Sequence, residues 1–179
     1  MADKFISPAH RAGTRLERSR IGRSGEEELK SVLRRYGFIV LTTGQENWLA
    51  KSVHDRIRPN HEDPMVQAIR YMPDFLAYHP QLDLRFFAYW DAKVNVTPGT
   101  LNFTIEKACY EEAIARTRKG ERVVIAFKEV DGRWFANWAE QLAVVADMSR
   151  QRRRAKGAKT PYLLISKAST HPLAQFINL

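Results

Sequence analysis

The sequence predicts an α/β (α+β) fold in which helices flank a central mixed sheet. Three observations support this prediction. Two stretches have the amphipathic pattern of helices, apolar runs typical of strands alternate with them, and Gly or Pro stands at most boundaries. The 179 residues are expected to form one domain with extensions. The core elements follow the order helix, strand, strand, strand, helix, strand, with a C-terminal extension.

The first helix is predicted from Ser24 to about Tyr36. Ser24 and Glu27 have the spacing of a capping box, which satisfies free backbone N–H groups at a helix start. An apolar stripe that includes Leu29 follows, and Gly37 ends the helix.

The strands of the core are predicted from apolar runs rich in β-branched and aromatic residues. These runs cover residues 38–41, 74–78, 84–94 and 122–130. Residues 45–71 form an insertion between the first two strands, with short helices expected at 47–55 and 63–71.

The second helix is predicted for residues 104–119. Asp131-Gly132 then has the composition of a hairpin turn, and a further helix is expected at 139–148. The core is therefore assigned to residues 24–148. A basic loop and a C-terminal tail, with a short strand at 162–166, occupy residues 149–179.

The chain is strongly basic, with 29 Lys and Arg against 20 Asp and Glu and a net charge of +9. The charge is concentrated in an N-terminal arm, residues 1–23, and in the loop that begins at residue 149. The side chains expected to bind nucleic acid are Arg15, Arg18, Arg20, Arg23, Arg152, Arg153, Arg154 and Lys156. Such side chains bind phosphates without reading sequence. The expected partner is DNA, with RNA as an open alternative.

The single cysteine, Cys109, excludes an internal disulfide and is expected to be a small buried residue of the second helix. No apolar run approaches the roughly 18 residues of a membrane span, and the polar N-terminus is unlike a secretory signal. The sequence therefore predicts a cytoplasmic protein without a membrane partner.

Two short motifs carry the candidate chemistry: Pro73-Asp74 and Asp91-Ala92-Lys93. Asp91 and Lys93 are two residues apart on a predicted strand, so their side chains point to the same face. A carboxylate pair that holds a hard divalent cation, beside an amine, is suited to hydrolysis of a phosphodiester. Mg²⁺ or Mn²⁺ is the expected cofactor.

Glu26 is a third candidate ligand because it lies in phase with Leu29 and Leu33 on the inward face of the first helix. A buried carboxylate is costly unless something neutralises it, and a metal shared with Asp74 and Asp91 would do so. The alternative is a simple acid at a helix N-terminus, which the helix dipole favours.

With these motifs the chain resembles the PD-(D/E)XK nuclease superfamily, and within it the archaeal-type Holliday junction resolvases. The order of elements over residues 24–128 looks like the restriction-endonuclease-like core of that superfamily. The resemblance implies a Mg²⁺-dependent DNA endonuclease. It implies that the metal ligands are Glu26, Asp74, Asp91 and the carbonyl of Ala92, and that Lys93 is the catalytic lysine.

Many members also carry Gln-x-x-x-Tyr on the second helix. Glu106 and Tyr110 have that spacing here, so they form a candidate second-helix site, although Glu106 departs from the pattern. A two-fold homodimer would suit paired cuts in a DNA junction.

Two other functions stay open. A catalytically inactive nucleic-acid-binding module on the same fold would use the same basic segments. A basic scaffold protein would leave Glu26, Asp74 and Asp91 apart in space. The nuclease hypothesis requires Asp74 and Asp91 to face the same side of the sheet.

Overall fold

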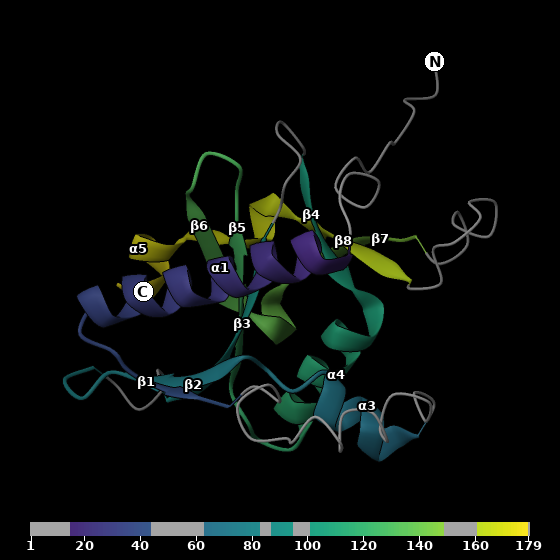
Figure 1. The fold of residues 1–179 in the computed structure, drawn as a ribbon, viewed down its shortest axis with the longest axis horizontal. Helices are drawn as coiled ribbons and strands as arrows, with labels where there is room; N and C mark the ends of the chain where they lie inside the picture. Colours follow the sequence, from purple (N-terminus) through teal and green to yellow (C-terminus); the bar gives the residue numbers. More distant parts are fainter. Residues whose placement is uncertain (1–14, 44–62, 83–86, 95–100, 149–160, 179) are drawn as a thin grey trace.

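The computed structural model describes residues 15–43, 63–82, 87–94, 101–148 and 161–178. It confirms the predicted fold class, because helices flank a central mixed sheet (Figure 1). The predicted short helix at 47–55, the basic loop at 149–160 and residues 1–14 of the predicted N-terminal arm lie outside the described residues. Within the described part of the chain, no helix is long and apolar enough to cross a membrane.

The described strands form two sheets, of which the larger contains the predicted core. Its strand order is β1-β2-β3-β5-β6-β9. β3 pairs with β5 in parallel, and the other neighbours are antiparallel. The bounds are β1 (Ile39–Thr42), β2 (Phe75–Tyr78), β3 (Ala88–Val94), β5 (Val123–Lys128), β6 (Trp134–Trp138) and β9 (His171–Pro172). The central strand β5 is buried along nearly its whole length, as expected for a strand covered on both faces.

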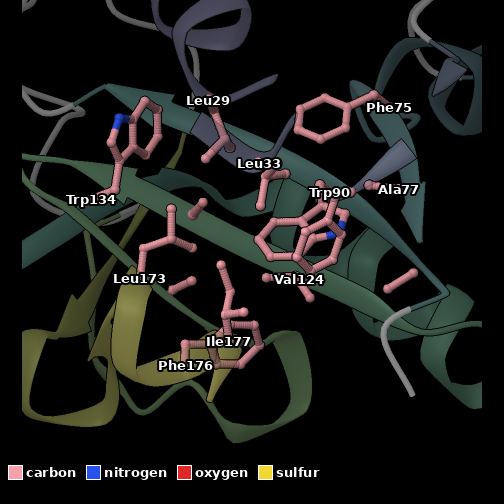
Figure 2. Packing of buried hydrophobic residues seen from close by; sticks show 14 residues of the cluster. Leu29, Leu33, Phe75, Ala77, Trp90, Val124, Trp134, Leu173, Phe176 and Ile177 are labelled. Carbon is pink, nitrogen blue, oxygen red and sulfur yellow. The ribbon is translucent and has the colours of Figure 1, made fainter. Parts of the chain in front are cut away.

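One face of this sheet is covered by two helices, α1 (Arg15–Arg35) and α5 (Leu173–Ile177). Figure 2 shows Leu29 and Leu33 of α1 and Phe176 of α5 gathered around Trp90 of β3. The ring of Phe176 meets that of Trp90 edge to face, with centroids 6.0 Å apart. This cluster fixes α1 against the strands that carry the candidate site.

The opposite face is covered by α4 (Lys107–Arg118) and by the smaller sheet. The smaller sheet has the order β4-β8-β7, formed by β4 (Asn102–Glu106), β8 (Tyr162–Ser166) and β7 (Val144–Asp147). Phe103 of β4 stacks on Phe127 of β5 with centroids 4.5 Å apart, which joins the two sheets through a second buried cluster.

The remaining described elements are short. α3 (Pro64–Arg70) agrees with the helix predicted at 63–71. The 3-10 turns are η5 (Ala139–Gln141) and η7 (Lys167–Ser169). The predicted hairpin at Asp131-Gly132 is confirmed, since it joins antiparallel β5 and β6 and Gly132 has φ of 88°.

The predicted start of the first helix is wrong. α1 begins at Arg15 rather than at Ser24, so Ser24 and Glu27 lie inside the helix and form no cap at its end. The residues before Ser24 include Leu, Glu and several Arg, which are good helix formers. The helix therefore continues through the position where the capping-box pattern predicted its first turn.

Two further segments predicted as helix are strands in the structure, because they pair with other strands of the smaller sheet. Residues 104–106 belong to β4, whose Phe103 and Ile105 are buried while Thr104 between them is exposed. Residues 144–147, predicted as part of a helix at 139–148, form β7 and pair with β8. The smaller sheet as a whole was not predicted from the sequence.

Candidate active site

The two aspartates of the motifs lie on neighbouring strands and on the same side of the sheet. β2 and β3 pair with Phe75 opposite Trp90, and continuing this register by one position places Asp74 opposite Asp91. Directly opposed residues in an antiparallel pair share a face. The backbone N–H of Ala92 donates a hydrogen bond of 2.8 Å to Oδ2 of Asp74, which ties the two motifs together.

The carboxyl group of Asp74 is strongly perturbed. Burial and then the negative charge of Asp91 raise its pKa from 3.8 to about 8, although Lys93 and the hydrogen bond from Ala92 act in the opposite direction. Glu26 adds to the increase. The site thus brings together more negative charge than it neutralises by itself, and an added cation would relieve this repulsion.

Asp91 is 4% exposed, and both of its carboxylate oxygens have a partner. Oδ1 accepts a hydrogen bond of 2.6 Å from Nζ of Lys93, in an ion pair. Oδ2 accepts a hydrogen bond from Sγ of Cys109 on α4, at 2.9 Å. The prediction that Cys109 is buried is confirmed, but its contact with Asp91 was not predicted.

Lys93 stays an ammonium in this environment. Burial acts to lower its pKa, but Asp91, Cys109 and Asp74 outweigh this and hold the pKa well above the ordinary lysine value. Burial and the charge of Asp91 raise the pKa of the Cys109 thiol well above its usual range, so the thiol stays protonated. Asp91 is therefore bonded to a positive charge through one oxygen and to a protonated thiol through the other.

Glu26 lies near this group but is held by another residue. Its carboxylate accepts a hydrogen bond from Nζ of Lys30, which also donates a hydrogen bond of 3.0 Å to the carboxylate of Glu27. Lys30 is 2% exposed and lies over the ring of Phe75, 5.6 Å from its centroid. Lys30 thus supplies the neutralising charge that the sequence argument assigned to a metal. The i, i+4 spacing of Glu26 and Lys30 was a signal for this pair.

The candidate second-helix pair is divided between two elements. Glu106 is the last residue of β4, and the hydroxyl of Tyr162 on β8 lies 3.4 Å from its carboxylate. Tyr110 is on α4, and burial together with the charge of Glu140 raises its pKa. The placement of Glu106 on a helix is therefore wrong, because β4 extends to that residue. The role of both residues in the site stays a prediction.

Comparison with solved structures gives high-probability matches to nucleases. A Holliday junction resolvase, Hjc, of the archaeal hyperthermophile Archaeoglobus fulgidus superposes with a TM-score of 0.51 and 12% identity, over 86% of this chain and 93% of that chain. The chain has the fold of this resolvase. D212, a nuclease from a fusellovirus, matches with a TM-score of 0.43 and 18% identity, over 91% of this chain and 90% of that chain.

No family model matches the sequence, and no curated protein matches it. At 12% identity the likeness to the resolvase is one of fold. It confirms the restriction-endonuclease-like architecture that the order of the elements predicted. The roles of Asp74, Asp91 and Lys93 stay predictions.

The basic residues predicted to bind nucleic acid are only partly described. Arg23 is exposed on α1. Arg15, Arg18 and Arg20 belong to the same helix, but their side chains are not among the described features. The arginines and the lysine of the loop at 149–160 lie outside the described residues. Their role stays a prediction.

The donors at the site fit a hard divalent cation. Asp74 and Asp91 present carboxylate oxygens on one face of the sheet, and their mutual repulsion is what a cation would remove. Over the described ranges, no three side chains of Asp, Glu, His or Cys lie together as a metal-binding group. Mg²⁺ is commonly held by one or two carboxylates while it keeps several waters, so two aspartates are a sufficient donor set.

Proposed function

We propose that the protein is a metal-dependent endonuclease that hydrolyses phosphodiester bonds in DNA. The observation that carries this proposal is the convergence of Asp74, Asp91 and Lys93, on a fold shared with a Holliday junction resolvase. Asp74 and Asp91 would hold Mg²⁺ or Mn²⁺, with the carbonyl of Ala92 and the carboxylate of Glu26 as further ligands. When bound, the cation would supply Lewis acidity at the scissile phosphate.

The residues of the chain have separate roles in this proposal. Asp74 and Asp91 fix the position of the cation relative to the strands. Lys93 keeps its positive charge, and its ammonium group is paired with Asp91. A phosphate bound at the cation would therefore lie beside this charge. There it would stabilise the negative charge that develops on the phosphate oxygens in the transition state.

The test is a cleavage assay on Lys93→Ala and Asp91→Ala with Mg²⁺ present. We expect each variant to lose at least about 100-fold in cleavage rate, because each removes charge stabilisation made in the transition state. DNA affinity should change little. Lys119→Ala is the matched control, since Lys119 is an exposed lysine at the C-terminal end of α4. Wild-type activity in purified Lys93→Ala would show that the site is wrongly assigned.

The second candidate is an inactive nucleic-acid-binding module on the same fold. The observation that favours it is the pairing of Glu26 with Lys30. Metal binding distinguishes the two functions. A nuclease should be thermally stabilised by Mn²⁺ in a manner reversed by EDTA, whereas a simple binder should respond to salt concentration and not to the metal.

For the substrate we propose branched DNA, cut by a homodimer, because the fold is that of a junction resolvase and a two-fold dimer would suit paired cuts. A cleavage assay with Mg²⁺ tests the proposed substrate. It compares a DNA junction, a flap, duplex DNA, single-stranded DNA and RNA side by side. Sedimentation equilibrium of the free protein gives its oligomeric state. Equal cleavage of duplex and junction, by a monomer, would contradict the proposed substrate.

A further inference from the structure

Cys109 is the buried partner of Asp91 for which the proposed mechanism has no role. It lies on α4, three residues after the end of β4, and it is 6% exposed. It belongs to an apolar cluster that includes Ile105 and Ala113, and the ammonium of Lys93 also lies beside the thiol. A small apolar residue would fill this space equally well. The thiol nevertheless lies 2.9 Å from Oδ2 of Asp91.

The terminal torsion of an aspartate is broad, so side-chain rotamer preferences alone do not fix the plane of the carboxylate. In Asp91 the plane is fixed by two contacts, Lys93 on Oδ1 and Cys109 on Oδ2. Loss of the thiol would leave Oδ2 without its donor in a residue that is 4% exposed. The carboxylate would then be free to turn towards the nearby positive charge.

We propose that Cys109 is a positioning residue of the site, whose thiol holds Oδ2 of Asp91 and thereby orients the carboxylate for a divalent cation. This inference rests on the proposed nuclease function. An oxygen that accepts one hydrogen bond keeps a further lone pair, so both oxygens of Asp91 stay able to bind the cation. Partners that orient a ligand in this way commonly affect metal affinity about 10- to 100-fold.

The experiment compares the full chain with Cys109→Ala, Cys109→Ser and a control, Ile105→Val. Cys109→Ala removes the donor, and Cys109→Ser keeps a donor of similar reach. Ile105→Val removes a buried methyl group from the same apolar cluster but leaves the thiol in place. The dissociation constant of Mn²⁺, measured by isothermal titration calorimetry, is a readout that does not depend on DNA cleavage.

We expect Cys109→Ala to weaken Mn²⁺ binding about tenfold, and Cys109→Ser to restore it to within about threefold of wild type. Ile105→Val should bind Mn²⁺ like wild type. Equal affinity in wild type and Cys109→Ala would overturn the positioning role. Equal weakening in Cys109→Ala, Cys109→Ser and Ile105→Val would also overturn it, because it would show that loss of packing is the cause. Either result would leave the nuclease proposal standing if wild type binds Mn²⁺ and cuts DNA.

The infrared S–H stretching band provides a readout in the unaltered protein. The chain has one cysteine, so the band belongs to Cys109. We expect the band to shift when Mn²⁺ is added, because the cation withdraws negative charge from Asp91 and weakens the hydrogen bond. A band unchanged by saturating Mn²⁺ would overturn the inference. Absence of Mn²⁺ binding in wild type would overturn both this inference and the proposed function.

Discussion

The carboxyl group of Asp74 lies where burial and a neighbouring negative charge both oppose its ionisation. Its pKa is raised from 3.8 to about 8. Between these values the folded protein holds a proton that the unfolded chain has released. By linkage, the free energy of unfolding then decreases as pH rises through this range. The contribution of Asp74 to stability is thus fully present below about pH 4 and is lost as pH approaches 8.

We therefore expect the protein in EDTA to be less stable at pH 8 than at pH 5 by more than about 1 kcal/mol, measured by urea denaturation. Asp74→Asn cannot ionise and should reduce this dependence. A wild-type stability that is constant or rises over the same range would contradict the predicted behaviour. So would an unchanged slope in Asp74→Asn.

Asp74, Asp91 and Lys93 of the candidate site were predictable from short motifs, because the direction of a side chain on a strand depends only on its position along that strand. Asp91 and Lys93 face one way by strand periodicity, and Pro73-Asp74 stands at the entry of the neighbouring strand. Cys109 was predicted as buried but not as a partner of Asp91, because that contact depends on how α4 crosses the sheet. No periodicity in the sequence specifies such a crossing.

At the scale of elements, α1 lies close enough to β3 that one of its glycines is required. A Cβ added at Gly25 would lie 2.2 Å from Cγ2 of Val94, whereas a Cβ at Gly22 would meet nothing within 4 Å. Both glycines lie within the same helix. This close approach also brings Glu26, the next residue, to the end of β3.

The two glycines form a matched pair for mutagenesis. Gly22→Ala should stabilise the protein by about 0.5–1 kcal/mol, since alanine has the higher helix propensity. Gly25→Ala should destabilise it by about 1–3 kcal/mol through overpacking. The double variant Gly25→Ala/Val94→Ala should recover part of that loss, so the changes in the free energy of unfolding of the two single variants should not add. Urea denaturation measures all of these values, and equal effects of the two glycine substitutions would contradict the close packing of α1 on β3.

The core elements were predictable because each has a clear hydrophobic pattern and a turn residue at its boundary. The apolar strand β5 and the hairpin glycine Gly132 are examples. The smaller sheet was not, because its strands pair only over long separations in sequence. β7 shows this well: it is mostly exposed and gave no alternating pattern, yet it pairs with β8. Tertiary pairing there overrides local helix propensity.

At the scale of the whole molecule, the C-terminal segment is part of the main core. Phe176 and Leu173 of α5 are almost completely buried in the cluster around Trp90 (Figure 2). β8 pairs with both β4 and β7. The segment that the sequence suggested as an appended tail therefore closes both faces of the central sheet.

This arrangement predicts a large effect for a residue close to the end of the chain. Phe176→Ala should lower the free energy of unfolding by about 3–5 kcal/mol, as is usual for removal of a buried aromatic ring. Val145→Ala on β7 is the control, because Val145 is 54% exposed, and should change stability by less than about 0.5 kcal/mol. Thermal unfolding followed by circular dichroism measures both. A loss below about 1 kcal/mol in Phe176→Ala would mean that α5 is not part of the core.

β4 ends at Glu106 and α4 begins at Lys107, so no loop separates the smaller sheet from the helix that carries Cys109. Lys107 is also joined to Asp147 of β7 by an ion pair of 2.8 Å. A movement of the smaller sheet would therefore reach the thiol beside Asp91 with no flexible link to absorb it. A ligand or protein that bound to the outer strands of that sheet would have a direct mechanical route to the carboxylate of Asp91.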